Sequence, residues 1–150
     1  MARRLQVVID CIDPQKLTPF WTAALGYVLE PPPAGFDSWN AYYLSIGEPP
    51  ESLPTEGDAA DAIIDPDGIG PRIWFQPVPE AKAIKNRLHL DIRVGGAKSD
   101  PFDQRKQLID AEAQRLVDLG ATIFNVSSTP DINHYGIVMQ DLEGNEFCLH

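Results

Sequence analysis

Three ionisable side chains of different chemistry alternate along one short segment. His89, Asp91 and Arg93 are each separated by a single aliphatic residue. This alternation is typical of a strand with one polar and one apolar face. We expect the apolar face to pack under a helix; it comprises Leu88, Leu90, Ile92 and Val94. Because an apolar core tolerates ionisable groups badly, the polar face is expected to meet water or a ligand.

The three polar side chains offer distinct chemistry. Histidine is a common general acid or base in enzymes, and His89 suits that role if Asp91 orients it. The Arg93 guanidinium is able to hold a carboxylate through two parallel hydrogen bonds. Each group also has a purely structural interpretation, in which Asp91 and Arg93 form an ion pair and His89 is a satisfied histidine. The sequence alone leaves both interpretations open.

Two other predicted strands carry the same alternation. In one, Ile73 and Phe75 form the apolar face, and in the other Leu5, Val7 and Ile9 do. The polar positions on these strands are Gln6, Asp10, Arg72, Trp74 and Gln76. A surface that combines an aromatic wall with a few placed polar groups suits a small polar or aromatic ligand.

The two cysteines, Cys11 and Cys148, are too few for a disulfide framework. Cys11 belongs to an apolar strand face and Cys148 to a polar one, so we predict no disulfide between them. Cys148 would act as a nucleophile only with a nearby base such as His89. The alternative is an inert, partly buried thiol.

Composition excludes several classes of protein. The 150 residues include 43% apolar and 23% charged types, which is typical of one globular domain. The formal net charge of -10 disfavours nucleic acid and anionic membranes as partners. Asp10 and Asp13 interrupt the apolar stretch near the N-terminus, which argues against a secretion signal and predicts a cytoplasmic protein.

The order of predicted elements occurs twice. The first round has a strand over 5–11, a helix starting at Asp13-Pro14 and restarting at Thr18-Pro19, a stop at Gly26, and strands near 27–30, 39–46 and 72–76. An acidic segment over 48–70 lacks Lys and Arg and is predicted to be an exposed loop. The second round has a strand over 87–94, a helix over 103–119 and strands at 121–127, 135–140 and 145–150. This repetition predicts an α+β fold.

Several segments together resemble a known superfamily. They are Phe20–Tyr27, Lys85–Asp91, Asp118–Ala121 and Asp141–Cys148. Their order is similar to that of the glyoxalase/bleomycin-resistance/dioxygenase (vicinal oxygen chelate) superfamily, in its branch of single-domain glyoxalase-like proteins. The resemblance implies one domain over 1–150, in which two βαβββ modules, about 4–79 and 85–150, enclose a shared cavity with their curved sheets. The segment over 48–70 would be an insertion, and a homodimer is implied.

In metal-using members of that superfamily, the first and last strands of each module carry the ligands. The matching positions here are Gln6, His89, Cys148 and either Trp74 or Gln76. Only His89 is a conventional ligand for the metals concerned. We therefore predict no metal cofactor; a divalent metal, if bound, would use His89, Gln6, Gln76 and Cys148.

The predicted function is binding of a small organic molecule in the cavity without the usual metal site. The residues expected to line it are Gln6, Asp10, Trp74, Gln76, Asp91, Arg93 and Cys148. The alternative is a lyase, isomerase or dioxygenase-type enzyme in which His89 is the catalytic acid/base or a metal ligand. A third hypothesis is that the cavity is vestigial and the segment over 48–70 binds a protein partner.

Overall fold

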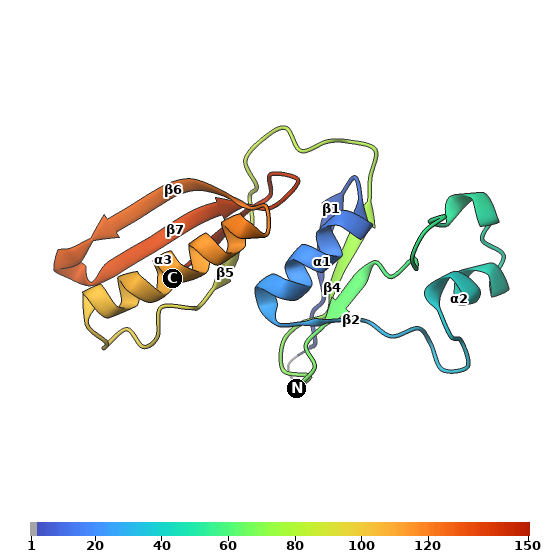
Figure 1. Cartoon of the computed structure of the whole chain (residues 1–150), viewed down its shortest axis with the longest axis horizontal. Coiled ribbons are helices and arrows are strands. Elements are labelled where there is room, and N and C mark those ends of the chain that lie inside the picture. Colours follow the sequence, from blue (N-terminus) through green and yellow to red (C-terminus); the bar gives the residue numbers. More distant parts are fainter. Residues whose placement is uncertain (1–2) are drawn as a thin grey trace. The chain divides into compact units, whose positions relative to one another are not determined.

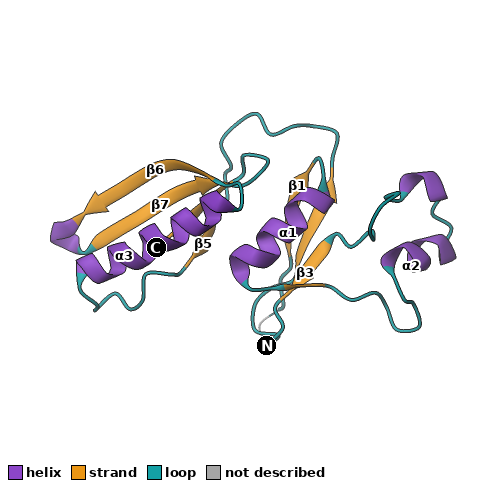
Figure 2. Ribbon diagram, viewed as in Figure 1, coloured by secondary structure: helices purple, strands orange, loops and turns teal. Residues whose placement is uncertain are grey.

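A computed structural model describes residues 3–150 and shows two compact units, one ending at Glu80 and one running from Ala81 to His150. Each unit contains a four-stranded sheet and a helix that packs on it (Figures 1 and 2). Among the described residues, no helix combines the length and hydropathy needed to cross a bilayer.

The first unit is built on β1 (Val7–Cys11), β2 (Val28–Leu29), β3 (Ala62–Ile64) and β4 (Ile73–Pro77). The strand order is β1-β4-β3-β2, with β1 parallel to β4 and the other pairs antiparallel. The helix α1 (Pro14–Leu25) packs on this sheet. Its buried residues Leu17, Phe20 and Trp21 meet Ile73 and Phe75 in the core of the unit.

The second unit repeats this topology with β5 (Leu90–Ile92), β6 (Thr122–Thr129), β7 (His134–Gln140) and β8 (Glu146–Leu149). The order is β5-β8-β7-β6, again with a parallel first and last strand and antiparallel neighbours. The helix α3 (Phe102–Asp118) covers one face of the sheet (Figure 1). The prediction of an α+β fold from two βαβββ modules is confirmed, and the shared cavity stays a prediction.

Helix α1 begins and ends where the sequence indicates. The Asp13 carboxylate accepts a hydrogen bond from the Gln15 N–H at 3.0 Å, and Gly26 ends the helix with φ 68°. The predicted restart at Thr18 is wrong, because the helix runs through Pro19 without interruption. Burial of one apolar face against the sheet stabilises the helix across the proline.

The second unit has its core between α3 and the inner face of its sheet. Ile109 and Leu116 of α3 are fully buried with Met139 of β7 and Phe147 of β8. The predicted strand over 87–94 is shorter, because only residues 90–92 pair with β8. Leu88 lies before that pairing and is 88% exposed, so its predicted burial under the helix is wrong.

The segment over 39–46 is a helix, α2 (Trp39–Ser45), and not the predicted strand. Ser38 caps it by accepting a hydrogen bond from the Ala41 N–H at 3.0 Å. The Asp58 carboxylate accepts from the next free donors, the N–H groups of Trp39 and Asn40, at 2.9 and 2.8 Å. Two side chains thus accept hydrogen bonds from the N–H groups of the first turn. These bonds stabilise a helix in spite of the strand propensity of its aromatic residues.

The acidic segment over 48–70 is not wholly a loop. It contains a short 3-10 helix, Pro50–Ser52, and the strand β3. Ile63 is fully buried, and β3 lies between β2 and β4 in the sheet. The apolar residues of β3 therefore belong to an inner strand of the sheet, whose partner strands are distant in the sequence.

Candidate functional site

The polar face of β5 meets that of β8 in the second unit. Asp91 lies beside Cys148 in the parallel pairing of the two strands. One ligand atom each from His89, Asp91 and Cys148 lies within 4.8 Å of the others. The His89 Nε2 is 3.2 Å from the Asp91 Oδ1, which is the orientation that the sequence anticipated for an acid/base histidine. We call these three residues the β5–β8 cluster.

A second histidine borders the β5–β8 cluster. The His150 Nδ1 lies 3.8 Å from the Asp91 Oδ2, so one carboxylate faces two imidazoles. Sequence reasoning did not select His150. The signal was present, since residues 148 and 150 share a strand face by alternation. Among residues 3–150, Asp91 makes its ion pairs with these histidines rather than with Arg93.

The thiol of Cys148 is held in its protonated form. Burial raises its pKa, and the negative charge of Asp91 and a hydrogen bond to that carboxylate raise it further. A thiol in this environment is a weak nucleophile at neutral pH. Cys11 is buried in β1 at 2% exposure, and neither Cys11 nor Cys148 forms a disulfide, as predicted.

Arg93 lines a pocket of about 500 Å³ in the second unit. His150, at the end of β8, and His134 and Tyr135, at the start of β7, line the same pocket. His134 and Tyr135 therefore both begin a strand and line this pocket.

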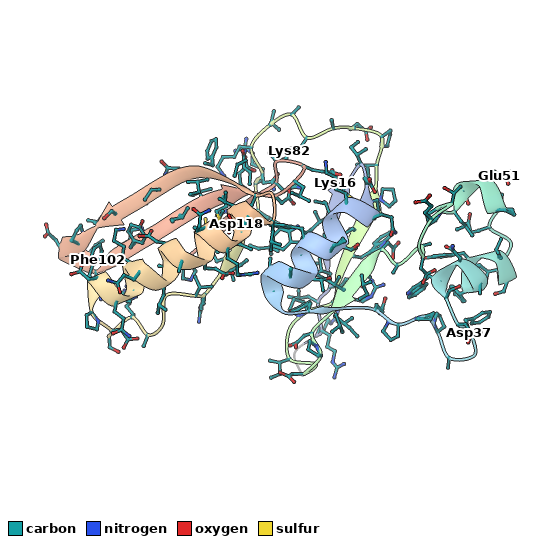
Figure 3. The ribbon with its side chains drawn as sticks, viewed as in Figure 1. Lys16, Asp37, Glu51, Lys82, Phe102 and Asp118 are labelled. Atoms are coloured by element: carbon teal, nitrogen blue, oxygen red, sulfur yellow. The ribbon has the colours of Figure 1, made fainter. Side chains whose placement is uncertain are left out.

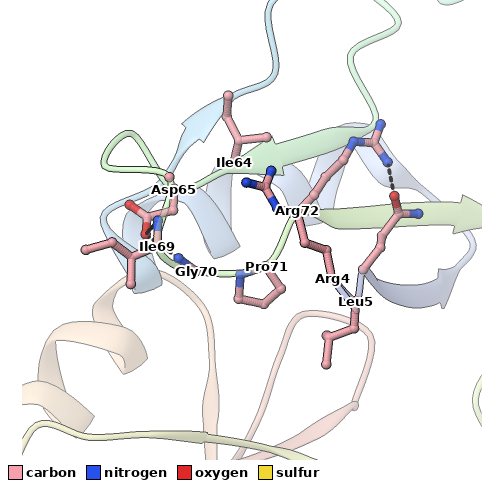
Figure 4. A pocket seen from close by; sticks show the side chains of 10 residues that line it. Arg4, Leu5, Ile64, Asp65, Ile69, Gly70, Pro71 and Arg72 are labelled. Carbon is pink, nitrogen blue, oxygen red and sulfur yellow. Dashed lines mark hydrogen bonds between the residues drawn. The ribbon is translucent and has the colours of Figure 1, made fainter. Parts of the chain in front are cut away.

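In the first unit, Gln6 is engaged by an arginine. The Arg72 Nη1 donates to the Gln6 Oε1 at 3.0 Å, and this bond crosses one side of a pocket of about 820 Å³ (Figure 4). The Arg72 Nε and Nη2 donate to the Glu30 carboxylate at 2.9 and 2.5 Å, and these bonds raise the pKa of the guanidinium. The amide oxygen predicted as a weak metal ligand is thus already a hydrogen-bond acceptor.

The strand register favours Trp74 over Gln76 as the counterpart of Cys148, given the correspondence of Gln6 with His89 that the resemblance implies. In the second unit, the residue two positions after His89 lies beside Cys148. In the first unit, the residue two positions after Gln6 is Val8, and it lies beside Trp74. Asp10 and Gln76 pair two residues further along.

Trp74 has an acidic partner that the sequence did not reveal. Its Nε1 donates to the Asp61 Oδ2 at 2.7 Å. Burial raises the pKa of Asp61, and the bond from Trp74 offsets part of that effect. Asp61 directly precedes β3, within the segment expected to be a loop. Its position could not be inferred without knowing that β3 is a strand.

Glu146 stands outside the β5–β8 cluster, as expected from its position. Its carboxylate accepts from the Asn86 N–H at 3.0 Å and lies 3.0 Å from the Lys82 Nζ; Figure 3 labels Lys82. Burial alone would raise the pKa of Glu146, but these donors outweigh burial and lower it to about 2. The hydrogen bond from the Asn86 N–H holds the segment before β5 against the start of β8. Asp141 and Asn145 are likewise bonded to each other around the turn at Gly144.

Comparison with known proteins identifies the family. The family model described as "Glyoxalase-like domain" matches residues 6–150. The chain belongs to the glyoxalase-like domain family. The superfamily resemblance is thereby confirmed. No curated protein matches the sequence.

Solved structures share the fold of this glyoxalase-like protein. A glyoxalase/bleomycin resistance protein/dioxygenase family enzyme from Burkholderia phytofirmans is 18% identical, with a TM-score of 0.56 over 96% of this chain and 94% of that one. A variant of the fosfomycin resistance protein FosX from Listeria monocytogenes, complexed with Mn(II) and 1S,2S-dihydroxypropylphosphonic acid, is 11% identical, with a TM-score of 0.61 over 100% and 92%. At these identities the likeness extends to the fold alone.

Proposed function

We propose that this glyoxalase-like protein binds a small organic molecule at the polar face of β5 and β8. The observation that carries the proposal is the β5–β8 cluster, in which one exposed carboxylate faces an exposed imidazole and a half-buried thiol. The His89 and Asp91 side chains are 42% and 50% exposed, so both are accessible to a ligand. Such convergent polar groups are what a pocket uses to orient its ligand.

Within this proposal, Asp91 positions His89. The His89 Nε2 faces Asp91 at 3.2 Å, which leaves the Nδ1 to exchange a hydrogen bond with the ligand. The Cys148 thiol, with its raised pKa, remains a neutral neighbour of the same carboxylate. The arrangement favours hydrogen bonding and proton exchange at His89 over attack by sulfur.

A metal-dependent enzyme is the second candidate, and the donor set supports it. Imidazole nitrogen, carboxylate oxygen and thiolate sulfur are all ligands of zinc, and catalytic zinc sites use three protein ligands with one open position. His89, Asp91 and Cys148 would hold the ion, which would act as a Lewis acid toward a substrate oxygen. Binding would have to release the Cys148 proton, so affinity would rise with pH.

The test measures metal and ligand binding on the same protein. Untagged wild type and H89A are analysed for metal content and titrated with Zn²⁺ and Co²⁺. H134A serves as the matched control, because His134 is an exposed histidine bonded to Ser127 rather than to Asp91. A library of small aromatic and polar fragments is then screened by amide NMR shifts.

Fragment-induced shifts at residues 89–93 and 146–150, reduced in H89A, are the result expected for the first candidate. One equivalent of a transition metal in wild type and H134A, lost in H89A, would replace it by the second. Absence of both metal and fragment shifts at these strands would contradict both candidates.

A further inference from the structure

A pocket in the second unit is lined almost entirely by cationic and neutral polar side chains. Its volume is about 500 Å³, within the range of small-molecule sites. Its polar lining comprises Arg93, Lys98, Arg105, Asn133, His134 and His150. No acidic residue lines it, although the chain carries a formal net charge of -10. A local excess of positive charge in an acidic protein indicates selection of an anionic ligand.

Arg105 is the buried centre of this pocket. The residue is only 7% exposed, and its Nη1 donates to the backbone oxygen of Asn133 at 2.7 Å. Its buried Nε has no hydrogen-bond partner in the described structure. A buried guanidinium is costly unless an opposite charge compensates it. Here the partners supplied by the described residues are neutral oxygens, which leaves the charge to be balanced by a ligand.

The surrounding backbone holds this arginine in place. Asn133 has a left-handed backbone with φ 50°, and its Nδ2 donates to the Lys98 carbonyl at 2.8 Å. One residue therefore receives the Arg105 hydrogen bond and ties the loop before α3 to the start of β7. The site is built by contacts between distant segments and is not a chance gathering of surface charges.

Nearby acidic groups already have partners, although one of the partners of Asp91 is the pocket residue His150. The Asp100 Oδ2 accepts from the Ala97 N–H at 2.8 Å, and Asp91 faces the two histidines described above. Across residues 3–150, no ion pair involves Arg93, Lys98 or Arg105. The guanidinium groups of Arg93 and Arg105 are thus available to a ligand with a negatively charged oxygen group.

We propose that this pocket binds the oxyanion group, carboxylate or phosphate, of a small organic molecule, with Arg105 and Arg93 as its principal donors. The inference rests on the proposed function for the organic ligand and deepens it by naming the charged group that this ligand carries. His150 lines the pocket and also faces Asp91, so the anion site adjoins the β5–β8 cluster.

The test uses two simple ions as probes. Wild-type protein is titrated with inorganic phosphate and separately with acetate, at constant ionic strength in chloride, while the Arg side-chain Nε–H and backbone amide resonances are followed by NMR. The variants are R105M and R93Q, with R87Q as the matched control for loss of one exposed positive charge in the same unit. R93Q keeps the test informative if R105M fails to fold, since Arg93 is exposed.

The expected result is saturable binding of one or both ions, weakened about tenfold or more in R93Q and R105M, as loss of a charged hydrogen bond predicts. R87Q should keep wild-type affinity. Saturation by phosphate alone assigns a tetrahedral group and by acetate alone a planar one; either supports the proposal.

Two results would overturn the proposal. One is the absence of saturable binding of either ion, and the other is an equal loss in R87Q, which would indicate general attraction to positive charge. If neither ion binds but fragments bind at residues 89–93, the proposed function stands and its ligand carries no anionic group. Ion binding without any fragment or metal binding would instead remove the proposed function and keep the anion site.

Discussion

In the first unit, the parallel strands β1 and β4 place Val8 beside Trp74, whereas in the second unit β5 and β8 place Asp91 beside Cys148. The strand order and directions are the same in both. Two residues further along, Asp10 pairs with Gln76 in the first unit. In the second unit, the Val94 N–H just after β5 donates to the backbone oxygen of His150.

The same backbone therefore carries different chemistry. The polar groups of the first unit satisfy one another, as in the bonds from Arg72 to Glu30 and from Trp74 to Asp61. In the second unit, one exposed carboxylate faces two histidines and a half-buried thiol, and the buried Arg105 has no acidic partner among residues 3–150. The fold therefore provides equivalent strand positions in both units, and the residue types at these positions make the second unit the better candidate for ligand binding.

The largest effect is expected from the two cores, which should be equally sensitive. Phe75 of β4 and Phe147 of β8 are both fully buried. Truncation of either to alanine leaves a cavity and should lower the free energy of unfolding by about 3–5 kcal/mol. Urea unfolding followed by circular dichroism measures both.

Tryptophan fluorescence sharpens this test, because Trp21, Trp39 and Trp74 all belong to the first unit. F75A must shift the fluorescence midpoint as well as the circular dichroism midpoint. A loss below about 1 kcal/mol in either variant would contradict the equal packing of the two cores.

The next largest effect on stability is expected from charged residues at the last strand of each unit. Glu146 begins β8, and Arg72 directly precedes β4. Replacing Glu146 by Gln removes a buried carboxylate bonded to Lys82 and Asn86, at an expected cost of about 1.5–3 kcal/mol near neutral pH. Because folding lowers the pKa of Glu146 from 4.5 to about 2, its contribution is present above pH 4.5 and is lost as the pH falls toward 2.

Denaturation of wild type and E146Q between pH 7 and pH 2 tests this sign. The two stability curves should converge as the pH falls. E30Q is the corresponding variant in the first unit, because the Glu30 carboxylate is bonded to Arg72, and it is unfolded under the same conditions. A difference between wild type and E146Q that stays constant down to pH 2 would show that the Glu146 pKa is not lowered.

A smaller effect separates the two helices. Asp13 caps α1 with its side chain, whereas α3 begins after Pro101 without a side-chain cap. The substitution D13A should therefore cost about 1 kcal/mol. Thermal unfolding measures it, with D103N as control, because Asp103 lies in the first turn of α3 and is not a cap. An equal loss of stability in D13A and D103N would show that negative charge near the helix N-terminus, and not capping, causes the effect.

The smallest effect tests the contact between Asp91 and Cys148. Since the charge of Asp91 helps raise the pKa of the Cys148 thiol, D91N should lower that pKa and increase the thiolate fraction. Alkylation by iodoacetamide at pH 8 should become about twofold to fivefold faster, as expected for one half-exposed charge. The C11S background isolates Cys148, and D100N is a control acid outside the contact. An unchanged rate would remove Asp91 from the surroundings of the thiol.

Much of this fold could be predicted because strand alternation and helix caps are local signals. Arg72 to Gln76 shows alternate burial as predicted, and Gly26 ends α1 where expected. The failures arise where distant contacts decide. Asp58, far along the chain, caps α2, and the pairing of Ile63 with β2 and β4 turns part of an acidic loop into a strand.

The candidate site follows the same division. Alternation placed His89, Asp91 and Cys148 on polar faces, and the structure brings them together. Alternation does not predict that Gln6 is bonded to Arg72 or that Trp74 is bonded to Asp61. Each partner lies next to a different strand, and the pairing of strands is not a local signal. Arg105 was missed because its helical position does not reveal a buried guanidinium.

The position of β8 between β5 and β7 has a consequence for the order of folding. Strands β6, β7 and β8 follow one another closely in sequence and are able to pair early, whereas β5 must close a long loop to reach β8. His89 and Asp91 therefore join Cys148 only in the last pairing event of the unit. A partly folded chain has no such cluster, so the ligand proposed to bind there would select the completed fold and stabilise it by mass action.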